Sequence, residues 1–183
     1  MQDILNIAGG TVAMRPYVFA FLAAYLFIAS AHLGWRKTII FTVVGYLIAF
    51  VSEVCSINTG FPYGWYYYLD ATKDRELWIA GVPFFDSLSY VFLAYCSYTA
   101  ALIAVAPVKI TGGRMTLLET RAIRKSLTVL ILAALFQVFL DIIIDPVALQ
   151  GNRWFLGQIY GYREAGAHFG VPISNYAGWL LTS

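Results

Sequence analysis

The sequence of 183 residues has few charged side chains, with 12 Lys or Arg and 10 Asp or Glu making up 12% of the chain. That is about half of the usual share in soluble domains. Because a soluble domain of this length needs a largely polar surface, the shortage excludes an ordinary soluble globular domain. With 60% hydrophobic residues and a mean hydropathy of +0.70, the chain is not disordered either. The net charge of +2 gives no sign of a nucleic-acid partner.

Signatures of metal and nucleotide binding are also missing. The two cysteines, Cys55 and Cys96, lie in apolar stretches, which favours buried hydrophobic side chains over a redox pair. The two histidines, His32 and His168, come without the Cys-His spacing that indicates zinc. There is no Gly-Lys-Ser phosphate loop and no dinucleotide-binding glycine fingerprint. We therefore expect no metal site and no redox or organic cofactor.

Four apolar segments are long enough to cross a membrane, which takes about 20 helical residues. They are predicted near residues 17–33, 38–57, 84–106 and 126–144. Pro146 is expected to follow the fourth segment, and Thr116 with Glu119 has the spacing of a capping box ahead of it. A fifth segment, 171–183, is too short to cross. It is either a re-entrant or interfacial piece or the start of a part that continues beyond the sequence.

These segments predict an all-α fold, a polytopic bundle of transmembrane helices in a single integral membrane domain. Seven Lys or Arg lie on the side of residues 34–37 and 107–125, and five lie on the other side, where acidic residues dilute them. The positive-inside rule places the side with seven in the cytoplasm. We therefore expect a multi-pass protein of the cytoplasmic (inner) membrane, with the long loops 58–82 and 146–170 outside.

Several pairs of similar residues recur at a constant spacing. The triplets 81–83 and 170–172 both read Gly-Val-Pro and lie 89 residues apart, as do Asp86 and Asn175, while Glu53 and Asp141 lie 88 apart. Each copy would be a helix ending in a carboxylate, an aromatic loop and a helix that starts at Gly-Val-Pro. These spacings are those of a parallel internal repeat, and coincidence in an apolar chain is the alternative.

Acidic residues in or at the ends of the predicted spans are the main functional signal. Each costs about 3 kcal/mol if it is ionised at mid-membrane, so such residues are rare and usually functional. The alternation of spans places four of them near the outer surface at a similar depth, namely Glu53, Asp86, Asp141 and Asp145. The helix dipole favours the anion at Asp86, whereas mutual repulsion and the dipole favour the protonated form of the other three. Such a group can hold an acid and a base together. Capping of helix ends is the alternative explanation.

Aromatic residues make up 17% of the chain, and residues 63–68 read Tyr-Gly-Trp-Tyr-Tyr-Tyr. An interfacial aromatic belt explains such a cluster. The wall of a cavity for a flat polyene or a cationic intermediate explains it equally well.

Four separated runs resemble one known family. They are residues 53–68 (EVCSINTGFPYGWYYY), 81–86 (GVPFFD), 141–154 (DIIIDPVALQGNRW) and 169–179 (FGVPISNYAGW). In this order they are similar to the carotenoid biosynthesis membrane proteins, a family that includes hydratases of bisanhydrobacterioruberin and gamma-carotene. The resemblance covers nearly the whole chain, although relatives usually continue with further apolar segments.

The resemblance implies hydration of the terminal isopropylidene double bond of a long acyclic carotenoid lying in the bilayer, with water and membrane lipids as the other partners. A carboxylic acid would protonate the double bond, and water would capture the tertiary cation. We assign the acid to Asp141 or Asp145, with Glu53 next, and the base or cation stabiliser to Asp86. The candidate cavity walls are Tyr63, Trp65, Tyr66 and Trp154, and the candidate polar contacts are Asn58, Asn175 and His168.

Other functions remain open at this stage. A carotenoid cyclase also begins by protonating an isoprenoid double bond. A membrane prenyltransferase would use Asp141 and Asp145 to hold magnesium on a diphosphate. A proton-coupled carrier or a scaffold would suit acids within spans and a parallel repeat. The sequence leaves the oligomeric state open.

Overall fold

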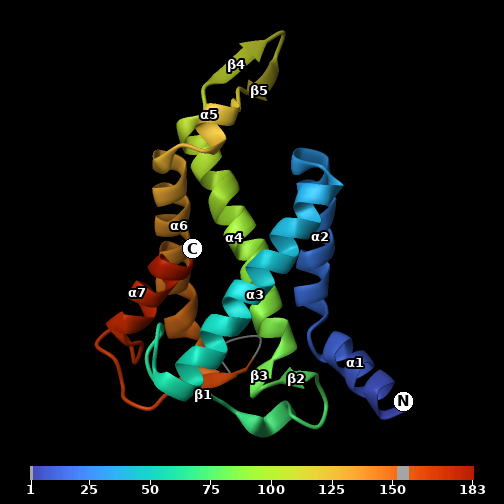
Figure 1. Cartoon of the computed structure of the whole chain (residues 1–183), viewed down its shortest axis with the longest axis vertical. Helices are drawn as coiled ribbons and strands as arrows, with labels where there is room; N and C mark the ends of the chain where they lie inside the picture. Colours follow the sequence, from blue (N-terminus) through green and yellow to red (C-terminus); the bar gives the residue numbers. More distant parts are fainter. Residues whose placement is uncertain (1, 152–156) are drawn as a thin grey trace.

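The computed structural model describes residues 2–151 and 157–183, which form seven α-helices, one 3-10 helix and six short strands. Four of these helices are long and apolar enough to cross a membrane: α2 (Pro16–Leu33), α3 (Trp35–Thr59), α4 (Phe84–Val105) and α6 (Leu127–Ala148). They run along the long axis of the molecule and overlap the four predicted segments (Figure 1). The predicted bundle of transmembrane helices is therefore confirmed.

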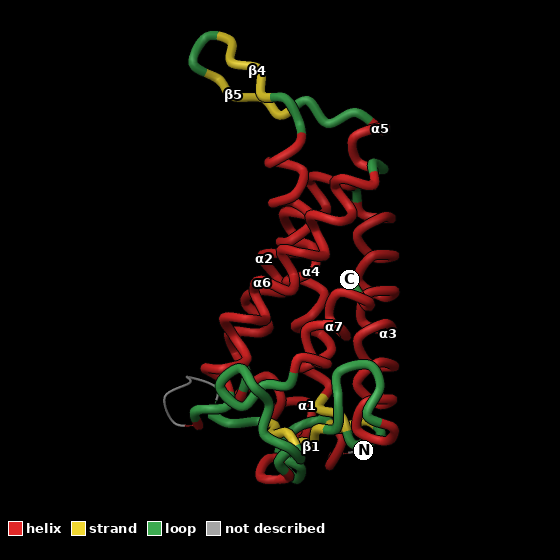
Figure 2. The backbone as a smooth tube through the Cα atoms, turned by 90° about the vertical axis from the view of Figure 1, so that its left-hand side faces the viewer, coloured by secondary structure: helices red, strands yellow, loops and turns green. Residues whose placement is uncertain are grey.

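The shorter elements gather at the two ends of the bundle. They are α1 (Gln2–Met14), η1 (Asp70–Thr72), α5 (Arg121–Arg124), α7 (Ile173–Thr182) and the strands β1 (Tyr66–Tyr68), β2 (Trp78–Ile79), β3 (Val82–Pro83), β4 (Val108–Thr111), β5 (Arg114–Leu117) and β6 (Tyr160–Tyr162). Three antiparallel pairs form, β1 with β6, β2 with β3 and β4 with β5. Figure 2 shows β4 and β5 projecting from one end, while β1 and the long loops lie at the other, which we call the loop end.

Helix boundaries follow local chemistry. Gly34 separates α2 from α3 with a φ of 84°, a left-handed value that only glycine adopts freely. Ser126 caps α6, because its hydroxyl accepts a hydrogen bond from the backbone N–H of Val129. Pro83 stands directly before α4 in an extended conformation. These boundaries determine which residues of each helix lie at the loop end.

Two predicted boundaries are wrong. Pro146 lies inside α6, which continues to Ala148 because the N–H of Leu149 still bonds the carbonyl of Asp145. A proline in the last turn removes a single helical bond, so the helix survives it. Thr116 belongs to β5 and caps no helix, since the pairing of β4 with β5 takes up this segment. The caps before α6 are Thr120 and Ser126.

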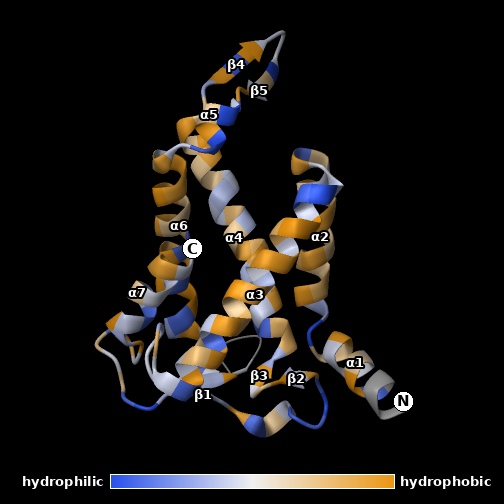
Figure 3. Ribbon diagram, viewed as in Figure 1, coloured by the Kyte–Doolittle hydropathy of each residue, from blue (hydrophilic) through white to orange (hydrophobic). Residues whose placement is uncertain are grey.

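Helix α4 is the centre of the bundle and contacts α2, α3 and α6. Figure 3 shows hydrophobic residues along α2, α3 and α6, with hydrophilic residues near the ends and in the loops. The buried core includes small and aromatic side chains side by side, such as Ala29 and Val91 against Tyr25 and Tyr95. Many large apolar side chains of these helices stay exposed, Phe27 to 78% for example, as expected for surfaces that face lipid.

The short C-terminal helix α7 covers most of the predicted partial segment 171–183. It has 10 residues and packs against α6 and α3. The Tyr90 hydroxyl of α4 donates a hydrogen bond to the carbonyl of Thr182 at 2.7 Å. Figure 1 shows α7 rising from the loop end beside α6. The first turn of α7 therefore lies beside the part of α6 that carries Asp141 and Asp145.

Candidate active site

A cavity of about 290 Å³ lies at the loop end between α2, α3, α4, α6 and α7. All four acidic residues singled out in the sequence line it, and they come from three helices: Glu53 of α3, Asp86 of α4, and Asp141 and Asp145 of α6. Three of them are buried, with Glu53, Asp141 and Asp145 exposed to 6%, 7% and 6%. The rest of the lining is mostly aromatic and aliphatic.

The α3–α4 side of the cavity holds one pair of acids. The Ser87 hydroxyl donates a hydrogen bond to Glu53 Oε2 at 2.7 Å, and the Tyr68 hydroxyl donates one to Asp86 Oδ2 at 2.6 Å. Ser87 and Asp86 are neighbours in the first turn of α4. Each acid on this side thus has its own donor.

The α6–α7 side is organised around one amide. Asn175, which is buried in the first turn of α7, donates through Nδ2 to Asp141 Oδ2 at 2.7 Å and to Asp145 Oδ2 at 2.6 Å. Asp145 also accepts hydrogen bonds from the hydroxyls of Tyr160 and Tyr162. Among the described residues, Asp145 therefore has three side-chain donors and Asp141 has one.

Four tyrosines cover the acids from the loop end. Tyr66 pairs with Tyr162 and Tyr68 with Tyr160 across β1 and β6. Opposed and alternate residues share one face of a strand pair, so all four rings lie on the same side. All four line the cavity, and their rings meet edge to face, Tyr66 and Tyr68 at 5.4 Å between centroids. These rings form an aromatic wall beside the carboxyl groups.

The buried hydroxyls of this wall stay protonated. Burial, followed by the charge of Asp86, raises the pKa of Tyr68 well above its usual range. Burial, followed by the charge of Asp145, raises the pKa of Tyr160 in the same way. Both groups therefore remain hydrogen-bond donors at neutral pH.

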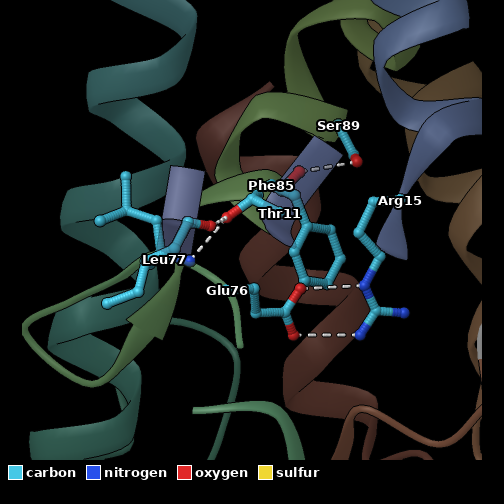
Figure 4. A network of polar contacts seen from close by, with 7 residues as sticks. Thr11, Arg15, Glu76, Leu77, Phe85 and Ser89 are labelled. Atoms are coloured by element: carbon cyan, nitrogen blue, oxygen red, sulfur yellow. Dashed lines mark hydrogen bonds and ion pairs between the residues drawn. The ribbon is translucent and has the colours of Figure 1, made fainter. Parts of the chain in front are cut away.

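A buried ion pair holds the start of α4 (Figure 4). Arg15 contacts Glu76 through Nε and Nη2, each at 3.1 Å, and both side chains are buried. The Arg15 guanidinium carbon also lies 4.3 Å from the centre of the Phe85 ring, next to Asp86 in the sequence. Thr11 accepts a hydrogen bond from the N–H of Leu77 at 2.7 Å. These contacts join the start of the chain to the loop before α4 and fix one wall of the cavity.

Some of the other predicted site residues line the cavity and others do not. Tyr63, Tyr66 and Asn175 line the cavity, so the structure brings them together with the acids. Trp154 lies outside the described residues. Three further predicted contacts do not line the cavity.

The reasons for these three differences are local. Trp65 comes directly before β1, where alternation turns it outward, and the Arg163 guanidinium stacks on its ring at 4.6 Å. Asn58 is exposed on α3 and bonds the carbonyl of Val54. His168 contacts the hydroxyl of Tyr176 through Nδ1 at 2.6 Å. The structure therefore places all three side chains outside the lining of this cavity.

Sequence reasoning missed Tyr68, Tyr160 and Tyr162, which supply hydroxyl groups to the acids. The signal was a Tyr-x-Tyr pattern at residues 66–68 and again at 160–162, which places two rings on one face of a strand. Nothing local indicates that these two segments pair with each other. In the part of the chain that the structure describes, no three His, Cys, Asp or Glu side chains are grouped to hold a metal ion. The arrangement can donate a proton, accept one and surround a cation with aromatic faces.

Comparison with known proteins gives two matches. The sequence profile of the carotenoid biosynthesis proteins matches residues 10–183. Bisanhydrobacterioruberin hydratase from Haloarcula japonica is 31% identical over 137 residues, which cover 74% of this chain and 39% of that protein. The match thus spans about two fifths of the length of that curated relative. No solved structure matches the chain.

Proposed function

Because the chain belongs to the family of carotenoid biosynthesis proteins, we propose that it is a membrane hydratase. Its substrate would be a long acyclic carotenoid, and its reaction the addition of water to a terminal isopropylidene double bond to give a tertiary alcohol. The hydratase activity of the similar Haloarcula japonica protein supports this reaction class. The observation that carries the proposal is the convergence of four carboxyl groups in a cavity with aromatic walls.

The first step is proton transfer from a carboxylic acid to the terminal double bond. Asp141 is the better donor of the α6 pair, because hydrogen-bond donors stabilise a carboxylate and Asp145 has three of them where Asp141 has one. Glu53, with Ser87 as its donor, is the next candidate. Proton transfer converts the π bond into a C–H bond and leaves a cation on the tertiary carbon.

The second step is capture of this cation by water. The faces of Tyr66 and Tyr160 and the charge of Asp145 stabilise the cation before capture. Asp86, held by Tyr68, accepts a proton from the attacking water, so that a C–O bond forms and a neutral alcohol results. The proton then returns to Asp141 through solvent. Each turnover consumes one water and needs no oxidant or reductant.

The polyene can remain among lipid tails while its end reaches the acids. Phe21, Phe92, Leu93 and Leu140 line the cavity away from the loop end, and Phe21 is exposed to 56% on the lipid-facing side of α2. The distribution of Lys and Arg supports the inner cell membrane as the location, with the loop end outside.

Expression in a lycopene-accumulating bacterium, followed by mass spectrometry of the pigments, tests this function. The chain should add one or two waters, and Asp141→Asn should lower the yield by a hundredfold or more, about the range for loss of a general acid. Asp145→Asn should also lower it strongly. Asp70→Asn makes the same change at an exposed position of η1 and should leave the pigment profile unaltered.

The remaining outcomes separate the alternatives. A product with the mass of lycopene but a different structure would identify a cyclase and overturn hydration. An unaltered pigment would be followed by a longer acyclic carotenoid in the same host. No hydrated product from either, with the protein present in the membrane, would refute the proposal. A proton flux in vesicles would then favour a carrier.

A further inference from the structure

Gln137 is a polar side chain of the cavity lining that the proposed reaction does not use. Gln137 lies on α6 one turn before Asp141 and two turns before Asp145, so the three share one face of the helix. The rise from Gln137 to Asp141 is about 6 Å. Gln137 is exposed to 2% and lines the cavity. It therefore lies deeper in the bundle than the acids, among side chains that are mostly apolar.

One end of the Gln137 amide has a partner inside the bundle, and the side chain lines the cavity. The buried Ser97 hydroxyl of α4 donates a hydrogen bond to Gln137 Oε1 at 3.0 Å. Among the described residues, Ser97 is the one hydrogen-bond partner of the Gln137 side chain. Because Ser97 occupies the amide oxygen, the two Nε2–H donors are the groups of this cavity-lining side chain that a substrate can meet.

The apolar surroundings make this donor selective. Phe92 and Leu93 of α4 and Leu140 of α6 line the same part of the cavity and offer no acceptor. A hydrocarbon chain in this space would displace water from Nε2 and leave a buried donor without a partner, which weakens binding. A chain with an oxygen atom at this level would accept the hydrogen bond. A site that holds such a donor discriminates against the analogue that lacks the oxygen.

We propose that Gln137 is a specificity-determining residue that donates a hydrogen bond to an oxygen atom of the substrate, one helical turn inward from the double bond that is hydrated. The preferred substrate is then a carotenoid that already carries a hydroxyl or keto group near the reacting end. A reaction that introduces this oxygen must precede the hydration. This inference rests on the proposed function, because the acids define where the reacting end lies.

Two probes and three variants test it. The probes are lycopene and a lycopene analogue with a hydroxyl or keto group on a methylene carbon between the terminal double bond and the next one. Binding to the purified chain in lipid nanodiscs is followed by quenching of tryptophan fluorescence, since Trp179 lines the cavity. Hydration is followed separately by mass spectrometry. The variants are Gln137→Leu, Ser97→Ala and Leu140→Met.

The wild-type chain should bind the oxygenated probe about tenfold or more tightly than lycopene. Gln137→Leu should bring this ratio to about one by weakening the oxygenated probe and not lycopene. Ser97→Ala should reduce the ratio in part, because the amide is then free to turn. Leu140→Met changes an apolar contact at the same level, so it should shift both affinities together and keep the ratio.

Equal wild-type affinity for the two probes would overturn the inference, as would a ratio that survives Gln137→Leu. A water molecule held by Gln137 in place of a substrate oxygen would give that equal affinity. If neither probe is hydrated, the proposed reaction fails, but the binding ratio still decides the role of Gln137. Failure of the specificity and failure of the reaction are thus distinguishable.

Discussion

The two halves of the cavity, α3–α4 and α6–α7, are built alike up to the residues that carry the chemistry. Before α4, Ile79 pairs with Val82 around a turn in which Ala80 and Gly81 have φ of 49° and 83°. Before α7, His168 and Val171 form a bridge around Phe169 and Gly170, with φ of 50° and 90°. Two consecutive positive φ values are typical of the tight hairpin turn with a right-handed twist.

This likeness continues into the following helices. Pro83 and Pro172 each precede a helix in an extended conformation, and the third helical residue is Asp86 in one half and Asn175 in the other. The same 89-residue spacing relates both turns, both prolines and this polar pair. The shared hairpin geometry supports the parallel repeat.

The difference between Asp86 and Asn175 is the instructive one. In the α3–α4 half, each helix contributes one acid. In the α6–α7 half, both acids lie on α6, and the amide of Asn175 bridges them. An acid in place of that amide would put a third carboxyl group beside Asp141 and Asp145 and remove the donor. The amide of Asn175 thus allows two acids to lie side by side on α6, which is what the proposed proton donor needs.

Asn175→Asp should break this arrangement most strongly. It should lower hydration by more than about a thousandfold and the free energy of unfolding by about 3 kcal/mol, because an uncompensated charge is buried beside Asp141 and Asp145. Product yield and thermal unfolding in detergent measure the two effects. Asn58→Asp makes the same change at an exposed position and should affect neither. Retained activity in Asn175→Asp would show that the amide is dispensable.

Asp86→Asn makes the first half resemble the second. We expect hydration to fall by about a hundredfold, since the water would lose its base, with a smaller effect on stability because no charge is added. The double variant Asp86→Asn with Asn175→Asp should not recover activity, because exchange leaves three acids crowded on one side. Recovery of product in the double variant would mean that the two halves are interchangeable.

Phenylalanine substitutions in the aromatic wall should have smaller effects, and unequal ones. In the described part of the chain, Tyr68 is the one side chain that donates to Asp86, whereas Asp145 keeps two donors without Tyr160. Tyr68→Phe should therefore reduce kcat by about tenfold, and Tyr160→Phe by less. Tyr67 lies between Tyr66 and Tyr68 in β1, and its ring is exposed. Tyr67→Phe should therefore leave kcat unaltered. Equal losses at Tyr68 and Tyr160 would contradict the difference in donors.

The sequence predicts a site residue when the pattern that indicates it is local, and fails when the residue depends on contacts between distant segments. Asp141 and Asp145 are four residues apart on one helix, and alternating spans bring Glu53 and Asp86 to the same end, so the acids could be found without coordinates. Strand alternation could also have separated Trp65 from Tyr66, since neighbours in an extended segment point to opposite sides.

Contacts between distant segments are not indicated by any pattern in the sequence. The pairing of Tyr66 with Tyr162 joins segments about half the chain apart, and each strand has only three residues. The Arg15 to Glu76 pair depends equally on tertiary folding. Short strands in an aromatic chain have little register information of their own, so the wall of tyrosines could be recognised only once the helices had placed both segments.

Alkaline pH should weaken the tyrosine wall. Burial and the nearby carboxylates raise the pKa of Tyr68 and Tyr160 above the value of about 10 in an unfolded chain. The folded state thus holds these protons more tightly, so its extra stability is fully present below pH about 10 and is lost as the pH rises further. Thermal unfolding against pH measures this loss. The double variant Tyr68→Phe with Tyr160→Phe should show a shallower decline, and an identical decline would exclude these two groups as its cause.

The smallest expected effects concern the two hairpin turns. Ala80 and Phe169 hold positive φ values, which cost an L-residue about 1 to 2 kcal/mol relative to glycine. Ala80→Gly and Phe169→Gly should therefore each raise the free energy of unfolding by up to about 1 kcal/mol, because glycine also loses more backbone entropy on folding. Chemical denaturation in detergent measures both. Similar gains at the two positions would agree with two copies of one turn, whereas destabilisation at either would show that its side chain contributes more than its strained backbone costs.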